Sequence, residues 1–133
     1  MAIGPQLDVE VHVPDALASI LTQQGKPIPK PVAGKALIDT GASITAVDGS
    51  IIQSLGVQPV GVATVHTPSG SAQQNQYPVK FMFPGSGLPP LIASQAIGSV
   101  LQSQGIVALI GRDSLSSVVF VYNGGAGMIT LAL

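Results

Sequence analysis

The sequence predicts an all-β domain. Its 16 glycines and 11 prolines divide 133 residues into short segments, many of them rich in Val, Ile and Leu. Residues 7–13 alternate between apolar and polar side chains, which is the pattern of a strand with one buried face. A chain of this length has room for a core, and no low-complexity stretch divides it. We therefore expect one domain over residues 1–133.

The first half of the chain predicts two strands and a helix around a connector. Residues 23–31 contain three prolines and two lysines, which is typical of an exposed loop or extended connector. Residues 1–32 are thus expected to form an N-terminal strand and this connector, and residues 33–133 the core. Residues 35–39 are expected to form a strand. Residues 48–56 predict a two-turn helix that Asp48 caps and Gly56 ends.

The second half predicts hairpins and one short helix. Residues 60–66 and 76–83 are expected to pair as a long hairpin, because the polar segment 67–72 between them forms turns readily. The remaining expected elements are strands at 91–97 and 106–110, a short helix at 112–117, and a closing hairpin of 118–122 and 128–133 around Asn123-Gly124-Gly125.

Composition limits the possible functions. Charged residues make up 8% of the chain, where about 25% is typical, and hydrophobic residues make up 46%. Much of the surface must therefore be small, uncharged polar or apolar, which favours burial against a second copy. The net charge of −1, with five scattered Lys and Arg, excludes the basic surface of a nucleic-acid binder.

No metal, cofactor or membrane partner is expected. The chain has no cysteine, and a zinc site would need its two distant histidines together with carboxylates. Residues 1–6 lack a basic stretch followed by an apolar one, so no secretory signal is expected. No apolar run approaches the ~18 residues of a membrane span. We expect a soluble, cytoplasmic protein, and a domain excised from a longer precursor would have the same features.

Asp39-Thr40-Gly41 is the candidate for chemistry. It follows an apolar strand directly, where a carboxylate is costly unless it has a function. A rigid strand end would hold Asp39, the Thr40 hydroxyl would fix the turn, and Gly41 would permit a close backbone approach or a positive φ. For the tripeptide alone, the alternative is a structural Asx-type turn after a strand.

Two segments and their order resemble a known family. Residues 36–43 read ALIDTGAS, and residues 107–115 read VALIGRDSL after the polar, glycine-tipped hairpin. Over about residues 33–133 this order resembles the retropepsins, the retroviral proteases and their cellular and bacterial single-lobe relatives. The resemblance implies an all-β closed or pseudo-barrel acid-protease lobe with one or two short helices. It also implies that Asp39 is the catalytic acid.

The single motif predicts a dimer. Aspartic proteolysis needs two facing carboxylates that share a proton, because like charges so close together cannot both ionise. The sequence has one Asp-Thr-Gly and no Asp-Ser-Gly. The second acid is therefore expected to be Asp39 of another copy across a two-fold axis. The expected partners are thus a second copy of the chain and a peptide or protein substrate.

The resemblance also implies roles for residues around Asp39. Thr40 would form hydrogen bonds across the dimer axis, and Gly41 would accept a hydrogen bond from the substrate backbone. The hairpin at about residues 65–74 would form a flap, with Gly70 at or near its tip, that closes over an extended substrate. The implied substrate contacts, with Ile44 as a further pocket wall, are Ala42, Ser43, His66, Thr67, Pro68, Ser69, Gly70, Ser71 and Ile110.

Gly111, Arg112 and Asp113 are expected to be structural. Retroviral members usually have Asp where Ser43 stands, and that Asp pairs with the arginine of the later segment. Arg112 lacks this partner, which leaves Asp48, Asp113 or a backbone carbonyl. Asp113 is predicted to satisfy backbone N–H groups at a helix start rather than to act as a second acid.

Three features have two interpretations each. His12 is predicted to be solvated, whereas His66 either contacts substrate or is an exposed hairpin histidine. Residues 129–133 either join a sheet across the dimer or form a core strand. The functional hypothesis is an aspartic endopeptidase that cleaves extended, apolar-flanked segments with a water activated by the Asp dyad at mildly acidic pH. The competing hypothesis is a catalytically silent module that binds peptides or directs assembly.

Overall fold

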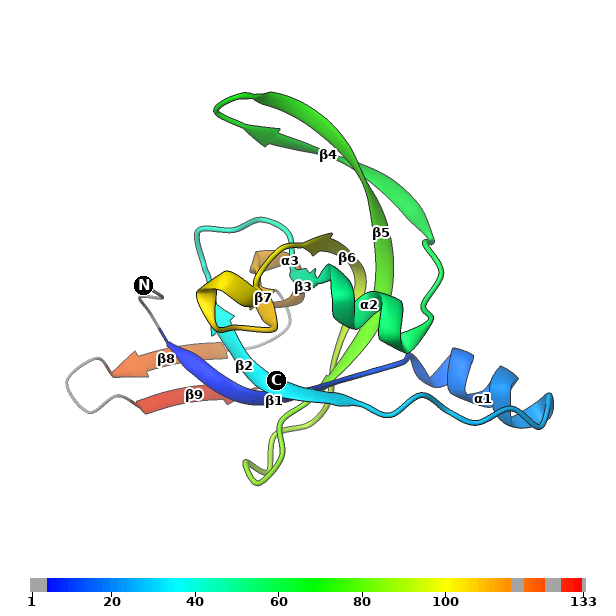
Figure 1. The fold of residues 1–133 in the computed structure, drawn as a ribbon. Coiled ribbons are helices and arrows are strands. Elements are labelled where there is room, and N and C mark those ends of the chain that lie inside the picture. Colours follow the sequence, from blue (N-terminus) through cyan, green and yellow to red (C-terminus); the bar gives the residue numbers. More distant parts are fainter. Residues whose placement is uncertain (1–4, 116–118, 124–127, 133) are drawn as a thin grey trace.

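The computed structural model describes residues 5–115, 119–123 and 128–132 and confirms the prediction of a mainly β fold (Figure 1). The strands of the main sheet are β1 (Gln6–His12), β2 (Val32–Ile38), β3 (Ala46–Asp48), β4 (Gly61–Thr67), β5 (Gly70–Met82), β6 (Leu91–Ser99) and β7 (Ala108–Ile110). They are hydrogen-bonded in the order β1-β2-β7-β3-β6-β5-β4, and β1 also pairs with β5. The pairings therefore run in a closed circuit through six strands and leave β4 outside it.

The alternating pattern of β1 is confirmed. Val9, Val11 and Val13 are buried, and they pack in one core with side chains from β2, β5 and β7. The opposite face is polar, as expected from the two-residue period of a strand. His12, which the sequence predicted to be only solvated, has its Nε2 3.0 Å from Glu10 Oε1. This short contact on the polar face corrects that prediction.

Three α-helices and a 3₁₀ turn are present where the sequence predicted one or two helices. They are α1 (Asp15–Gln23), α2 (Gly49–Leu55), η1 (Gln102–Gln104) and α3 (Arg112–Leu115). The prediction for α2 is confirmed at both ends, because Asp48 accepts a hydrogen bond from the backbone N–H of Ser50 and Gly56 ends the helix with a φ of 66°. The short helix predicted at 112–117 corresponds to α3, and residues 116 and 117 lie outside the described ranges.

The sequence analysis missed α1. Residues 1–32 were expected to be a strand and an extended connector, but residues 15–23 are helical, and the irregular connector that follows is residues 24–31. No residue of α1 is fully buried, and Ile20 is 49% exposed. Leu17, Ile20 and Leu21 follow the i, i+3, i+4 spacing of an amphipathic helix, a signal that the sequence analysis passed over.

The pairing of β2 with β7 positions the residues of interest. The two strands are parallel, with Ile38 opposite Ile110, so the segments that follow β2 and β7 leave the sheet at the same edge. β3, a strand too short to be predicted, pairs antiparallel with β7 and parallel with β6. Asp39 and Gly111, each the next residue after its strand, therefore lie side by side at this edge.

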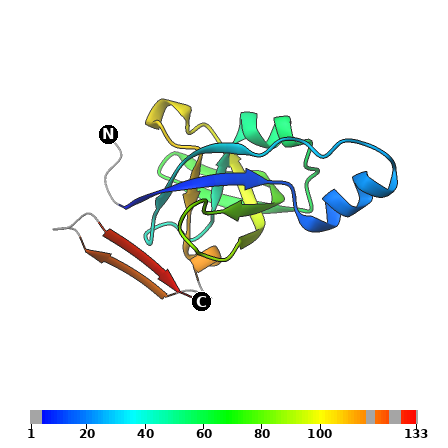
Figure 2. The same cartoon turned by 90° about the horizontal axis from the view of Figure 1, so that it is seen from below.

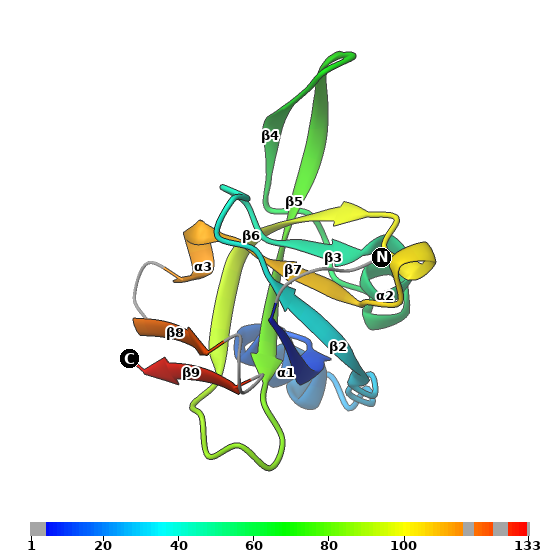
Figure 3. The ribbon, with the colours of Figure 1, turned by 90° about the vertical axis from the view of Figure 1, so that its left-hand side faces the viewer.

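The predicted long hairpin is confirmed, with a shorter turn than expected. β4 and β5 pair from Gly61 opposite Gln76 to Thr67 opposite Gly70, so Pro68 and Ser69 alone form the turn. The sequence predicted a turn over residues 67–72, but the ladder continues because polar side chains are tolerated on an exposed ribbon. The hairpin extends away from the body on the side of the β2–β7 edge (Figures 1 and 3).

The predicted closing hairpin is also present. β8 (Val119–Asn123) and β9 (Met128–Ala132) pair antiparallel and form a two-stranded sheet separate from the main one (Figure 2). The expected turn at Gly124 and Gly125, and residues 118 and 133 of the predicted strands, lie outside the described residues. Within the described chain, β9 pairs with β8 and is not a strand of the main sheet, which argues against the core-strand interpretation.

Replacing Asp48 with asparagine is expected to lower the free energy of unfolding by about 2 kcal/mol at pH 7. Asp48 Oδ1 accepts from the backbone N–H of Leu101 and Gln102, and Oδ2 accepts from the N–H and hydroxyl of Ser50. An amide must turn its NH₂ toward one of these two sets of donors. Urea denaturation checks the loss, with Asp8→Asn as control, because the exposed Asp8–Lys35 pair should contribute less than about 1 kcal/mol.

The same contacts predict a pH dependence. The Ser50 hydroxyl, helped by the backbone N–H groups of Leu101, Ser50 and Gln102, lowers the pKa of the Asp48 carboxyl despite its burial. The folded state thus binds this proton less readily than the unfolded state. The stabilisation is therefore complete above the unfolded pKa of about 3.9 and is lost as the pH falls through the lower folded value. An Asp48→Asn variant with the stability of Asp8→Asn at pH 7 would contradict both expectations.

Candidate active site

Asp39 is held by the backbone at the end of β2. Its N–H donates to the carbonyl of Ile110 at 3.0 Å, which extends the β2–β7 pairing by one residue. Its own carbonyl accepts from the N–H of Ala42 at 3.1 Å, and its Oδ1 accepts from the N–H of Gly41 at 3.0 Å. The last contact is an Asx-type turn, the structural alternative predicted for this tripeptide. The half-buried carboxylate therefore has a fixed position at the sheet edge.

Gly41 is needed for close approach. A Cβ built on it would lie 3.2 Å from Asp39 Oδ1, and Gly41 is not among the glycines with positive φ. The sequence analysis gave two reasons for a glycine here, a close backbone approach or a positive φ, and the close approach is the one that applies. A side chain at this position would press on the carboxylate.

The segment after β7 packs against the Asp39 loop (residues 39–44) and forms hydrogen bonds to its backbone. A Cβ on Gly111 would lie 2.8 Å from the carbonyl carbon and oxygen of Ile44. The N–H of Arg112 donates to the carbonyl of Ala42 at 2.9 Å. Arg112 Nη1 donates to the carbonyl of Thr40 at 3.1 Å, so a backbone carbonyl takes the place of the missing acidic partner.

Thr45 is a structural residue that the sequence analysis missed. It is fully buried, and its N–H and hydroxyl donate to Asp113 Oδ1 at 3.0 and 2.7 Å. Its oxygen accepts from the N–H of Gly111 at 3.1 Å and lies 2.7 Å from Ser114 Oγ, which must be the donor because the Thr45 proton is already used. Asp113 Oδ1 also accepts from the N–H of Ser114. These contacts fit the structural role predicted for Asp113.

A groove of about 370 Å³ opens between the Asp39 loop and β4. Of the predicted substrate contacts it includes Ala42, Ser43 and His66. Ile110 does not reach it, because its side chain is fully buried in the core. Residues 68–71, at the end of the hairpin, are not among its walls either. The residues that line this loop–hairpin groove are Gly41, Ala42, Ser43, Ile44, Thr64, Val65, His66 and Ile97.

The sequence analysis missed two of these walls, Thr64 and Ile97, whereas Val65 lay within the predicted flap. Thr64 lies two residues before His66 on β4 and so shares its face by the two-residue period of a strand, which would have suggested it. Ile97 lies on β6 opposite Ala46, and its N–H donates to the carbonyl of Thr45 at 3.0 Å. No local pattern predicts this position, because it depends on a pairing between strands far apart in the chain.

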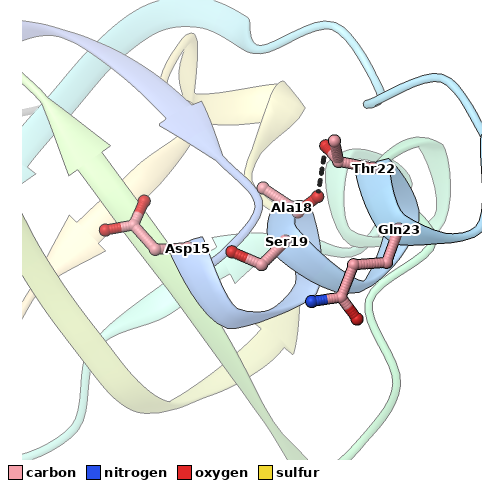
Figure 4. A pocket seen from close by; sticks show the side chains of 5 residues that line it. All are labelled: Asp15, Ala18, Ser19, Thr22 and Gln23. Atoms are coloured by element: carbon pink, nitrogen blue, oxygen red, sulfur yellow. Dashed lines mark hydrogen bonds between the residues drawn. The ribbon is translucent and has the colours of Figure 1, made fainter.

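A second hollow lies along α1 and is lined by Asp15, Ala18, Ser19, Thr22 and Gln23 (Figure 4). α1 precedes the start of β2, whereas Asp39 follows its end. The one carboxylate among the residues that line this hollow is that of Asp15, whose Oδ1 lies 2.6 Å from Lys80 Nζ. In the described part of the chain no three His, Cys, Asp or Glu side chains are grouped as a metal site would require. Within the same residues no helix has the length and apolar character of a bilayer span.

Comparison with known proteins gives matches in structure only. No protein-family model and no curated protein matches the sequence. The solution structure of the simian foamy virus (mac) protease matches with a TM-score of 0.53 and 20% identity, over 84% of this chain and 91% of that one. A foamy viral protease-reverse transcriptase in complex with an RNA/DNA hybrid matches equally well, but over 12% of its own length. The chain therefore has the retropepsin-like fold of a retroviral protease.

Proposed function

We propose that the chain is one subunit of a homodimeric aspartic endopeptidase. The observation that carries the proposal is the position of Asp39, a carboxylate fixed at the end of β2 on the loop that lines the groove. Asp39 is not itself a lining residue of the groove, but its Oδ1 accepts from the N–H of Gly41, which is one. The retropepsin-like fold supports the same conclusion.

The proposed chemistry needs two copies of Asp39. The dyad formed across the two-fold axis shares one proton and titrates as a unit. Its ionised member takes a proton from a water molecule, whose oxygen then attacks the scissile carbonyl carbon. The protonated member donates a hydrogen bond to the carbonyl oxygen. The carbon–nitrogen bond breaks as the amine nitrogen gains a proton.

The groove suits an extended peptide with apolar side chains. Ile44, Val65 and Ile97 supply apolar walls, and β4 is an edge strand outside the closed circuit of pairings. A substrate strand held there would form main-chain hydrogen bonds, which give affinity without fixing sequence. We propose that the hairpin end at residues 67–71 closes over this strand as a flap. Thr40 would brace the two Asp39 loops against one another.

The C-terminal hairpin is proposed to contribute to the dimer. β8 and β9 form a sheet of their own, and two strands alone are only marginally stable in water. Burial against a second copy would stabilise them. The low charge of the chain favours the same arrangement.

The activity per subunit is expected to fall on dilution. Below the dimer dissociation constant, the dimer concentration varies as the square of the subunit concentration, so specific activity should fall about tenfold for each tenfold dilution. A peptide library assayed at pH 4–7, with carrier protein against adsorption, gives this measurement, and sedimentation gives the oligomeric state. Pepstatin should inhibit the cleavage.

Constant specific activity in samples that sediment as monomers would contradict the proposal. Peptide binding without any cleavage would instead favour the catalytically silent module.

A further inference from the structure

The loop–hairpin groove has one ionisable wall. Seven of its lining residues are Gly, Ala, Ser, Thr, Val or Ile, and His66 is the eighth. A carboxylate of the substrate that enters the groove therefore has one side chain among these residues that is able to carry the opposite charge. Charge-assisted hydrogen bonds are about twice as strong as neutral ones.

We propose that His66 determines substrate specificity, and that the groove selects peptide segments with an acidic side chain opposite β4. The inference rests on the proposed peptidase function and names a substrate class for it. The apolar walls would hold the neighbouring side chains, and His66 would fix the position of the acid along the groove.

The position of the His66 ring is set by the hairpin itself. His66 on β4 lies opposite Ser71 on β5, and its Nδ1 is 2.9 Å from Ser71 Oγ. In a protonated ring both nitrogens donate. Ser71 Oγ then accepts from Nδ1, and Nε2 remains to donate to a substrate carboxylate. The serine therefore orients the imidazolium without neutralising it.

The surrounding charges restrict where the acid binds. The lining residues of the Asp39 loop and of β6 are uncharged, and β5 contributes Ser71 opposite the ring. The acid nearest in sequence to the lining residues is Asp39, whose Oδ1 accepts from the N–H of Gly41, one of those residues. Two carboxylates repel. The acidic side chain is therefore expected some residues away from the scissile bond, not beside it.

The selection is expected to depend on pH. Histidine changes its charge between pH 5 and 8, the only side chain whose ordinary titration falls there. The proposed peptidase is expected to act at mildly acidic pH, and a protonated imidazole binds a carboxylate more strongly than a neutral one does. Preference for an acid should therefore decline as the pH rises toward neutrality.

Matched peptides test the inference. One cleaved parent peptide is made with Glu or Gln at each position around the bond, and the kcat/KM ratio of each Glu/Gln pair is measured at pH 5 and pH 7. At one position the wild type should prefer Glu about tenfold at pH 5, equivalent to about 1.4 kcal/mol. His66→Gln should reduce this ratio to about one. His66→Lys should keep the preference at pH 7, because lysine stays charged there.

The remaining outcomes separate the two proposals. His12→Gln changes the other histidine and should leave the ratio unchanged. Cleavage of the parent with no Glu preference at any position, or an unchanged ratio in His66→Gln, would overturn the role of His66 and leave the peptidase standing. Failure of the wild type to cleave any peptide would overturn both.

Discussion

Asp39→Asn is expected to reduce kcat/KM for peptide cleavage by at least about 10³-fold, because the amide can neither take the proton of the attacking water nor share one with its twin. The fold should persist. The carbonyl oxygen of the new side chain can still accept from the N–H of Gly41, which now bonds to Asp39 Oδ1 at 3.0 Å. Steady-state kinetics give the loss, and circular dichroism with sedimentation checks the fold and the dimer.

Mixing subunits sharpens this test. If the active unit is a dimer, exchange of wild type with an equal amount of Asp39→Asn should lower activity per wild-type subunit to about half, since only dimers with two acids cleave. Asp15→Asn is the matched control, because Asp15 lies on α1 and pairs with Lys80. Mixing wild type with Asp15→Asn should leave the activity per wild-type subunit unchanged. Full activity of a clean Asp39→Asn preparation would exclude the proposed mechanism.

Local patterns predicted the elements whose structure is decided locally. The helix α2 has its N-cap in Asp48 and its C-terminal glycine in Gly56, and both act as the sequence predicted. The alternation of Val9, Val11 and Val13 placed one face of β1 in the core. The Asx-type turn at Asp-Thr-Gly was predicted as the structural alternative for this tripeptide, because an Asp side chain readily accepts from the backbone N–H two residues on.

Long-range contacts account for most of what was missed. β3 has three residues and exists because β7 and β6 pair with its two sides. Thr45 reads as an ordinary polar residue until the fold brings Asp113, Gly111 and Ser114 against it. α1 was missed for a different reason, because Leu17, Ile20 and Leu21 do follow helical spacing but lie in a stretch that was assigned to the strand and connector.

Substitution of Gly111 by alanine is expected to destabilise the fold by about 2–4 kcal/mol. The new Cβ would lie 2.8 Å from the carbonyl carbon and oxygen of Ile44 and 3.0 Å from the carbonyl oxygen of Ala42. All three are backbone atoms, so no side-chain rotation relieves the contact. Either β7 or the Asp39 loop must move, and peptide cleavage should fall together with stability.

Gly98→Ala provides the control for this prediction. A Cβ on Gly98, in β6, would lie 3.6 Å from Ile52 Cδ1, which is an ordinary van der Waals distance, and its φ is not positive. Alanine should cost less than about 1 kcal/mol there. Urea unfolding of both variants at one fixed protein concentration separates a local clash from a general intolerance of alanine. Equal stability of the two variants would show that the Asp39 loop does not rest on Gly111, and that its position is set elsewhere.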